Sequence, residues 1–248
     1  MPKQLQTFKL TVEYDGGNYF GFQKQKNHPT IQEELETACR KLFQKKVRVV
    51  GAGRTDSGVH AEGQVVHIRV RSKLPAAKIQ GGLNHYLPKD ISILNVGEAP
   101  ASFHAQFSAK SKIYEYRILN SSVRSPLERN RSFQVRERLD VAKMKRAARM
   151  ICGRHDFRAF EASGGRRRRS VRTIKTCKVE KKGKLILITV ESGGFLYKMV
   201  RSIAGTLIAI GTGRLALADL KAILGHQNRG LVGPTVPPQG LVLKRVVY

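Results

Sequence analysis

An arginine and an aspartate stand two residues apart in the glycine-rich segment GAGRTDSGVHAEGQVVHI, residues 51–68. In an extended backbone, residues i and i+2 point to the same side, so Arg54 and Asp56 are expected to lie together. A guanidinium within about 4–6 Å keeps a carboxyl group ionised at neutral pH. An ionised carboxylate in such a loop can act as a nucleophile or a base. Taken alone, an Arg-x-Asp sequence is more often a turn cap with its own ion pair.

Other kinds of site lack the residues they need. Asp56 has no neighbouring acidic cluster, which a two-metal nuclease would require. His60 and His67 have no third ligand at zinc-binding spacing, and the three cysteines form no CxxC pair. No GxxxxGK[ST] phosphate loop occurs, which argues against an ATP-driven motor or a kinase. We therefore expect a site with no metal.

The charge of the chain predicts a polyanionic partner. Its 248 residues include 46 Lys and Arg against 18 Asp and Glu, a formal net charge of +28. Such an imbalance repels itself in the folded state and favours nucleic acid as partner, with an anionic membrane surface second. No apolar run approaches the length of a membrane-spanning helix, and the first residues carry no signal-peptide core. With unpaired cysteines, these features predict a cytoplasmic protein that binds no membrane.

Basic residues concentrate between Arg166 and Lys184, where ten of them accompany a single acidic residue, Glu180. The segment GGRRRRS precedes a predicted strand and is expected to form a basic loop. A charge run of this kind is about as often a solvated surface. With the charge of the whole chain, phosphate contact becomes the better reading, and arginine suits bidentate contact. The predicted RNA contacts are Arg166, Arg167, Arg168 and Arg169.

Hydrophobic periodicity predicts two similar halves. In the first, a capping box of Thr30 and Glu33 is expected to start a helix. The first half reads strand 8–14, helix from Thr30, strands 47–52 and 64–70, helix 76–86, strand 91–97. The second reads strand 112–119, helix 140–152, a hairpin around Gly183, helix 195–211, an added helix 215–224 ending at Gly225, and strand 240–248.

This order is the ferredoxin-like plan, repeated. We predict an α+β fold of two tandem ferredoxin-like (βαββαβ) halves, residues 1–105 and 106–248. The halves are expected to form an extended antiparallel sheet with helices on one face and a central basic RNA-binding cleft.

The segment AGRTDSGVHAEGQVVHI closely resembles the signature of the TruA family of tRNA pseudouridine synthases, which usually reads AGRTDAGVHA. Further blocks resemble the family in order along nearly the whole chain. They are YDGGNYFGFQKQ (14–25), LNHYLPKDISI (83–93), FHAQFSAKSKIYEYRI (103–118), GRHDFRAF (153–160), GGFLYKMVRSIAGTLIAIGTG (193–213) and GPTVPPQGLVLKRVVY (233–248).

The resemblance implies an isomerase that converts uridine to pseudouridine at nucleotides 38, 39 and 40 of the tRNA anticodon stem-loop. The reaction in this family needs no cofactor and no metal. Members form homodimers in which two subunits together hold one tRNA, so the resemblance also implies a homodimer.

The resemblance also assigns residues. Asp56 matches the essential catalytic aspartate, and Arg54 matches the arginine thought to fill the place of the extruded base, whose removal from a stem requires a few kcal/mol. Tyr114 matches a tyrosine that stacks on the uracil, and Arg201 an arginine that pairs with the catalytic carboxylate. Leu241 matches an apolar residue near the base. Without the resemblance, Tyr114 and Leu241 are core residues and Arg201 is an ordinary exposed helix arginine.

Four positions depart from the usual pattern. Ser57 stands where alanine is usual and Phe22 where tryptophan is more common, while Pro238 and Val242 replace alanine and tyrosine. A different class of function also accounts for the charge and the fold: a non-catalytic basic RNA-binding or ribosome-associated protein. Such a protein has no need of a carboxylate in its RNA cleft, where it would repel phosphate.

Overall fold

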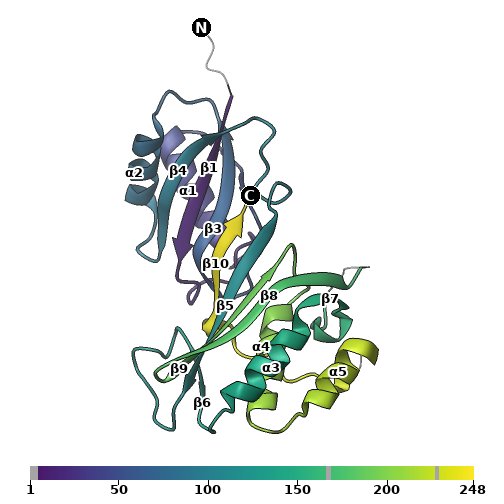
Figure 1. Cartoon of the computed structure of the whole chain (residues 1–248). Coiled ribbons are helices and arrows are strands. Elements are labelled where there is room, and N and C mark those ends of the chain that lie inside the picture. The colour runs from purple at the N-terminus through teal and green to yellow at the C-terminus, as the bar shows by residue number, and fades with distance from the viewer. Residues whose placement is uncertain (1–4, 166–168, 227–228) are drawn as a thin grey trace. The chain divides into compact units, whose positions relative to one another are not determined.

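The computed structural model describes residues 5–165, 169–226 and 229–248 of the chain. Two compact units are present: Met1–Lys110 together with Leu243–Tyr248, and Ser111–Val242. Both contain strands and helices, so the predicted α+β class is confirmed (Figure 1).

The first unit has the ferredoxin-like order of elements. They are β1 (Gln6–Tyr14), α1 (Ile31–Phe43), β2 (Val49–Gly51), β3 (His60–Val70), α2 (Ala76–Tyr86) and β4 (Ile91–Ala99). The strands run in the order β4-β1-β3, β2 pairs with β3, and the four strands are antiparallel. The last residues of β10 (Leu241–Val247) lie beside β3.

One face of β1 forms the core of this unit. Phe8, Leu10, Val12 and Tyr14 are all at most 2% exposed, as their alternation predicts. The opposite face of the strand is less buried, and Glu13 is exposed. The buried stripe of α1, which includes Ile31 and Leu35, supplies further core.

The second unit also alternates strands and helices. Its elements are β5 (Ser111–Asn120), β6 (Phe133–Val135), α3 (Val141–Ile151), β7 (Gly153–Asp156), β8 (Val171–Lys182), β9 (Leu185–Ser192), α4 (Met199–Gly211) and α5 (Leu217–His226). The strand order is β5-β9-β8-β7, and β6 adds to β5 in parallel. The expected hairpin turns at Gly183, which has a φ of 60°. Short strands β6 and β7 carry too few residues for periodicity to indicate them.

Two helix ends differ from the sequence prediction. Thr30 is the N-cap of α1, but its side chain makes no capping hydrogen bond, because the hydroxyl is buried without a partner. Glu33, the other half of the predicted capping box, instead pairs with Lys24 at 3.1 Å. Gly225 does not follow α5 but lies within it, since the helix continues to His226.

No helix in the described part of the chain is both long and apolar enough to cross a membrane.

Candidate active site

The segment that carries Arg54 and Asp56 is a loop between β2 and β3 in the first unit. Backbone hydrogen bonds hold both of its ends. The N–H of Ala52 donates to the carbonyl of Val65 at 2.8 Å, and the N–H of Val59 donates to the carbonyl of Asp56 at 3.2 Å. The Gln64 amide donates to the carbonyl of Gly53 at 3.0 Å. The backbone at Asp56 is therefore part of a closed turn.

Thr55 fixes the direction in which its neighbours point. Its hydroxyl lies 2.8 Å from the hydroxyl of Tyr14, and both side chains are buried. Its carbonyl accepts a hydrogen bond from the N–H of Phe22 at 3.1 Å. While Thr55 is anchored in the core, Arg54 is exposed and Asp56 is half-buried. Asp56 is thus a partly exposed residue on a well-anchored loop.

Burial raises the pKa of Tyr14 to about 12, although its hydrogen bonds with Thr55 and Gln64 oppose that shift. Tyr14 therefore stays protonated at neutral pH. It serves as a neutral anchor for the loop, since a proton donor with so high a pKa is poorly matched to chemistry near pH 7.

Glycines near the loop are required by packing within the protein. A Cβ on Gly16 would lie 2.0 Å from the carbonyl oxygen of Val59, and a Cβ on Gly51 would lie 2.6 Å from the ring of Phe22. No side chain fits at position 51, because the Phe22 ring occupies that space. Phe22 is the residue that stands in place of the family's more common tryptophan, and it is 3% exposed.

The hydroxyl that Ser57 adds relative to alanine makes a contact. It donates to the carbonyl of Tyr19 at 3.2 Å, and the N–H of Gly58 donates to the same carbonyl at 3.3 Å. The hydroxyl of Tyr19 donates in turn to Asp90 at 2.6 Å. Ser57 thus ties the loop to a residue that is itself anchored, an interaction that the sequence did not indicate.

His60 and His67, the histidines closest to the loop in sequence, accept hydrogen bonds from the backbone. His60 Nδ1 accepts the N–H of Gly16 at 3.1 Å, and His67 Nδ1 accepts the N–H of Ala105 at 3.1 Å. Asp15 also lies 3.0 Å from His60 Nδ1, a contact that would need a protonated nitrogen. We assign His60 Nδ1 as the ring nitrogen without a proton, because the backbone N–H of Gly16 can only donate to it. Burial lowers the pKa of His67 to about 4. Among the described residues, no group of three or more His, Cys, Asp or Glu is placed to hold a metal ion.

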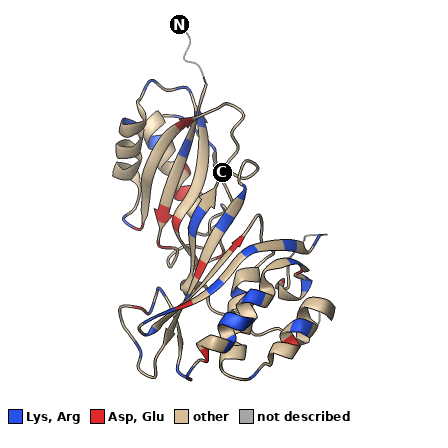
Figure 2. Ribbon diagram, viewed as in Figure 1, with Lys and Arg blue, Asp and Glu red and all other residues tan. Residues whose placement is uncertain are grey.

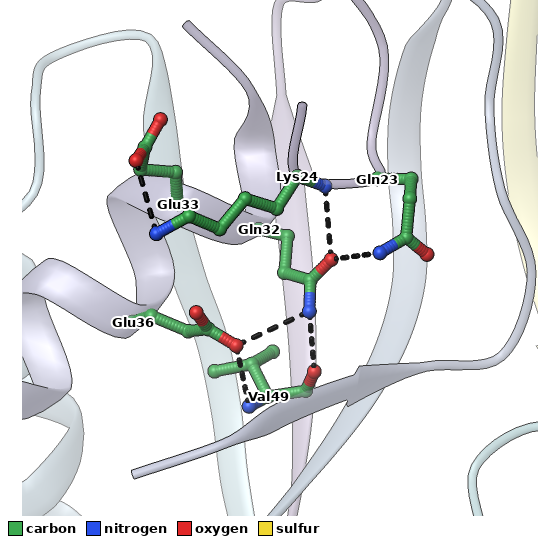
Figure 3. A network of polar contacts seen from close by, with 6 residues as sticks. All are labelled: Gln23, Lys24, Gln32, Glu33, Glu36 and Val49. Atoms are coloured by element: carbon green, nitrogen blue, oxygen red, sulfur yellow. Dashed lines mark hydrogen bonds and ion pairs between the residues drawn. The ribbon is translucent and has the colours of Figure 1, made fainter. Parts of the chain in front are cut away.

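A polar network around Gln32 ties the neighbouring loop to the start of β2 (Figure 3). The Gln32 carbonyl oxygen accepts from the side chain of Gln23 at 2.8 Å and from the N–H of Lys24 at 3.0 Å. Its amide donates to Glu36 and to the carbonyl of Val49, both at 3.1 Å. All four hydrogen-bonding positions of one amide are used, so Gln32 joins α1, β2 and the preceding loop.

Tyr114, predicted to stack on uracil, lies on β5 in the second unit. It is 8% exposed and opposite Val190 of β9. The ring of Phe195 meets it edge-on, with centroids 5.2 Å apart and planes at 89°. This T-shaped geometry is a favourable aromatic arrangement and fixes the tilt of the tyrosine ring.

Arg201 lies on α4 in the same unit and is only 9% exposed. It is therefore not an ordinary exposed helix arginine. Its Nε donates to the carbonyl of Val236 at 2.7 Å. The adjacent carbonyl, that of Pro237, accepts from the hydroxyl of Tyr116 at 2.8 Å. A buried guanidinium needs such partners, because burying a charge without them is costly.

Two further predictions fall in the second unit. Leu241, the first residue of β10, is 5% exposed, so the structure places it in packed surroundings. Arg169 is exposed, and its carbonyl accepts from the guanidinium of Arg172 at 3.0 Å. Arg166, Arg167 and Arg168 lie outside the described residues. The phosphate contacts of this loop stay a prediction.

These features define the class of the protein: a basic α+β protein with a partly exposed aspartate on an anchored turn. A sequence model described as tRNA pseudouridine synthase matches residues 10–108 and 147–248. The chain belongs to this family of isomerases.

Curated relatives match over nearly their full length. A tRNA pseudouridine synthase A of Ruminiclostridium cellulolyticum is 47% identical over 98% of this chain and 100% of its own. A tRNA pseudouridine synthase A 2 of Clostridium perfringens is 43% identical over the same shares. A tRNA pseudouridine synthase A of Listeria innocua is 42% identical over 97% of this chain and 98% of its own.

Proposed function

We propose that the protein converts uridine to pseudouridine at nucleotides 38, 39 and 40 of the tRNA anticodon stem-loop, with Asp56 as its single catalytic carboxylate. The proposal rests on family membership and on one observation of the loop. The side chain of Thr55 is fixed in the core, while the next residue, Asp56, remains partly exposed.

The reaction is an isomerisation that consumes no co-reactant. The bond between uracil N1 and C1′ breaks, the uracil turns while it is bound, and a bond forms between C5 and C1′. The proton on C5 leaves to solvent, and N1 carries a proton in the product. Asp56 acts on the nucleoside as a nucleophile or a base, roles that an ionised carboxylate can perform.

The other residues keep the roles that the resemblance implies. Arg54 fills the place of the extruded nucleotide, for which an exposed guanidinium is suited. Tyr114 stacks on the uracil, as aromatic rings do in RNA sites, and Arg201 and Leu241 complete the binding of substrate. Arg166, Arg167, Arg168 and Arg169 contact the phosphate backbone. We further propose a cytoplasmic homodimer.

Mapping of pseudouridine in a tRNA transcript tests the choice of nucleotides. Transcripts with uridine at only one of positions 38, 39 and 40 are compared with a matched transcript that has cytidine at all three. Pseudouridine at each of the three positions, and none in the cytidine control, supports the proposal. Equal modification of the control would show that the enzyme acts elsewhere in tRNA.

A further inference from the structure

Every charged residue on the solvent face of α3 is basic. Its four charged residues, Lys143, Lys145, Arg146 and Arg149, are all exposed. Its buried residues are Met144, Ala147, Ala148 and Ile151. Figure 2 shows the resulting concentration of blue along this helix.

This arrangement does not favour the stability of the helix. Lys145 and Arg149 are four residues apart, and Arg146 and Arg149 are three apart, spacings at which like charges repel. Lys143 stands near the N-terminus, where the helix dipole disfavours a cation. In α1 the charges are arranged in the favourable way, with Glu33 and Glu34 in the first turn and Arg40 and Lys41 in the last. The charges of α3 therefore call for a partner outside the helix.

The acidic residues just before α3 are already engaged. Asp140 caps the helix by accepting the N–H of Lys143 at 2.9 Å, and its carboxylate lies 3.7 Å from the Lys143 ammonium. Glu137 forms an ion pair with Arg214. Asp140 also attracts the guanidinium of Arg146, but these contacts involve neither Lys145 nor Arg149.

Within the second unit, α3 covers the side of the sheet to which Tyr114 points. Tyr114 is opposite Val190, and Val190 is opposite Cys177 of β8, so the three side chains share one side. The thiol of Cys152, the C-cap residue of α3, lies 4.0 Å from the carbonyl of Cys177.

Lys178 and Lys182 of β8 are exposed. Strand alternation from Cys177 places Lys178 on the opposite side of the sheet, and Lys182, four residues further, shares that side.

We propose that the solvent face of α3 binds backbone phosphates of the tRNA, through Lys145, Arg146 and Arg149. The inference rests on the proposed function for the identity of the RNA. An anionic membrane is the weaker partner, because a helix that lies on a bilayer inserts its apolar face, and here that face is buried in the protein.

The test compares two charge-matched double variants, Lys145→Gln/Arg149→Gln on α3 and Lys178→Gln/Lys182→Gln on β8. Glutamine has nearly the helix propensity of lysine and arginine, so the fold of α3 is retained. Dissociation constants for full-length tRNA are measured from 50 to 200 mM salt. Each lost phosphate contact reduces the slope of log K against log salt by about 0.9, so the α3 variant is expected to lose about 1.8. The β8 variant is expected to keep the wild-type slope.

Thermal unfolding without RNA adds a second readout. The α3 variant is expected to melt at or above the wild-type temperature, because a repulsive pair has been removed. An unchanged salt slope, or an equal loss in the β8 variant, would overturn the proposal. So would capture of the wild type, but not of the α3 variant, on phosphatidylglycerol vesicles with tRNA binding unaffected. Pseudouridine formation by the wild type is assayed in parallel, so a failure of the proposed function is seen separately from a failure at α3.

Discussion

The hydrogen bond between Tyr14 and Thr55 is expected to hold the loop that carries Asp56, and a double-mutant cycle measures its strength. Thr55→Val removes the hydroxyl while nearly keeping the shape of the side chain. It leaves the Tyr14 hydroxyl, on a residue 2% exposed, with the Gln64 amide at the long distance of 3.5 Å. A buried donor that loses its partner destabilises a protein by about 1–3 kcal/mol.

Tyr14→Phe leaves the buried Thr55 hydroxyl in the corresponding position, so each single variant is expected to lose about 1–2 kcal/mol. In the double variant both partners are gone. Its loss should therefore be smaller than the sum of the two by about 1 kcal/mol.

Urea unfolding, followed by tyrosine fluorescence because the chain has no tryptophan, gives the free energies. Thr11→Val serves as the control, since Thr11 is a half-buried threonine on β1, the strand that carries Tyr14. This control variant should change the free energy of unfolding by less than about 0.5 kcal/mol. Strict additivity of the two single variants would refute the coupling and with it the account of how the loop is anchored. Each variant is also expected to turn over tRNA more slowly than the wild type, because the proposed role of Asp56 depends on where the loop places it.

Three further outcomes follow from packing and titration. Gly16→Ala should destabilise the protein by about 2 kcal/mol or more in urea unfolding, because its Cβ would lie 2.0 Å from the Val59 carbonyl oxygen, which belongs to the backbone. Gly225→Ala should instead stabilise it by about 0.5–1 kcal/mol, since Gly225 lies within α5 and a Cβ there meets nothing within 4 Å. His67 has a folded pKa of about 4, below its unfolded value of 6.5, so its contribution is present above pH 6.5 and is lost as pH falls toward 4. The stability difference between wild type and His67→Asn, measured by urea unfolding at several pH values, should therefore narrow over that range; a constant difference would contradict the assignment.

The sequence predicts those parts of the fold that depend on local pattern. The alternation in β1 and the presence of a helix within residues 76–86, where α2 lies, follow from the sequence pattern. The capping box at Thr30 fails because tertiary packing buries the hydroxyl and Lys24 draws Glu33 away. The sequence predicts a helix that ends before Gly225, but local propensity alone cannot decide whether a helix continues through a glycine.

The candidate site shows the same limit. Family resemblance singled out Arg54 and Asp56, but their supports are contacts between residues far apart in the chain. Thr55 meets Tyr14 across 41 positions, and Ser57 meets Tyr19 across 38. The burial of Arg201 could be predicted only if the position of Val236 were known. The division of the chain into halves at residue 105 stays a prediction.

Release of tritium from tRNA labelled at uridine C5, compared between the wild type and Asp56→Asn, measures directly whether Asp56 is required for pseudouridine formation. We expect release by the wild type and a loss of at least about 100-fold in the variant. We also expect the variant to bind tRNA still, because removal of a negative charge does not weaken contact with phosphates. Equal release by both proteins would keep the isomerase and refute Asp56 as its catalytic residue. No release by either, with tRNA still bound, would contradict catalysis and favour a binding protein.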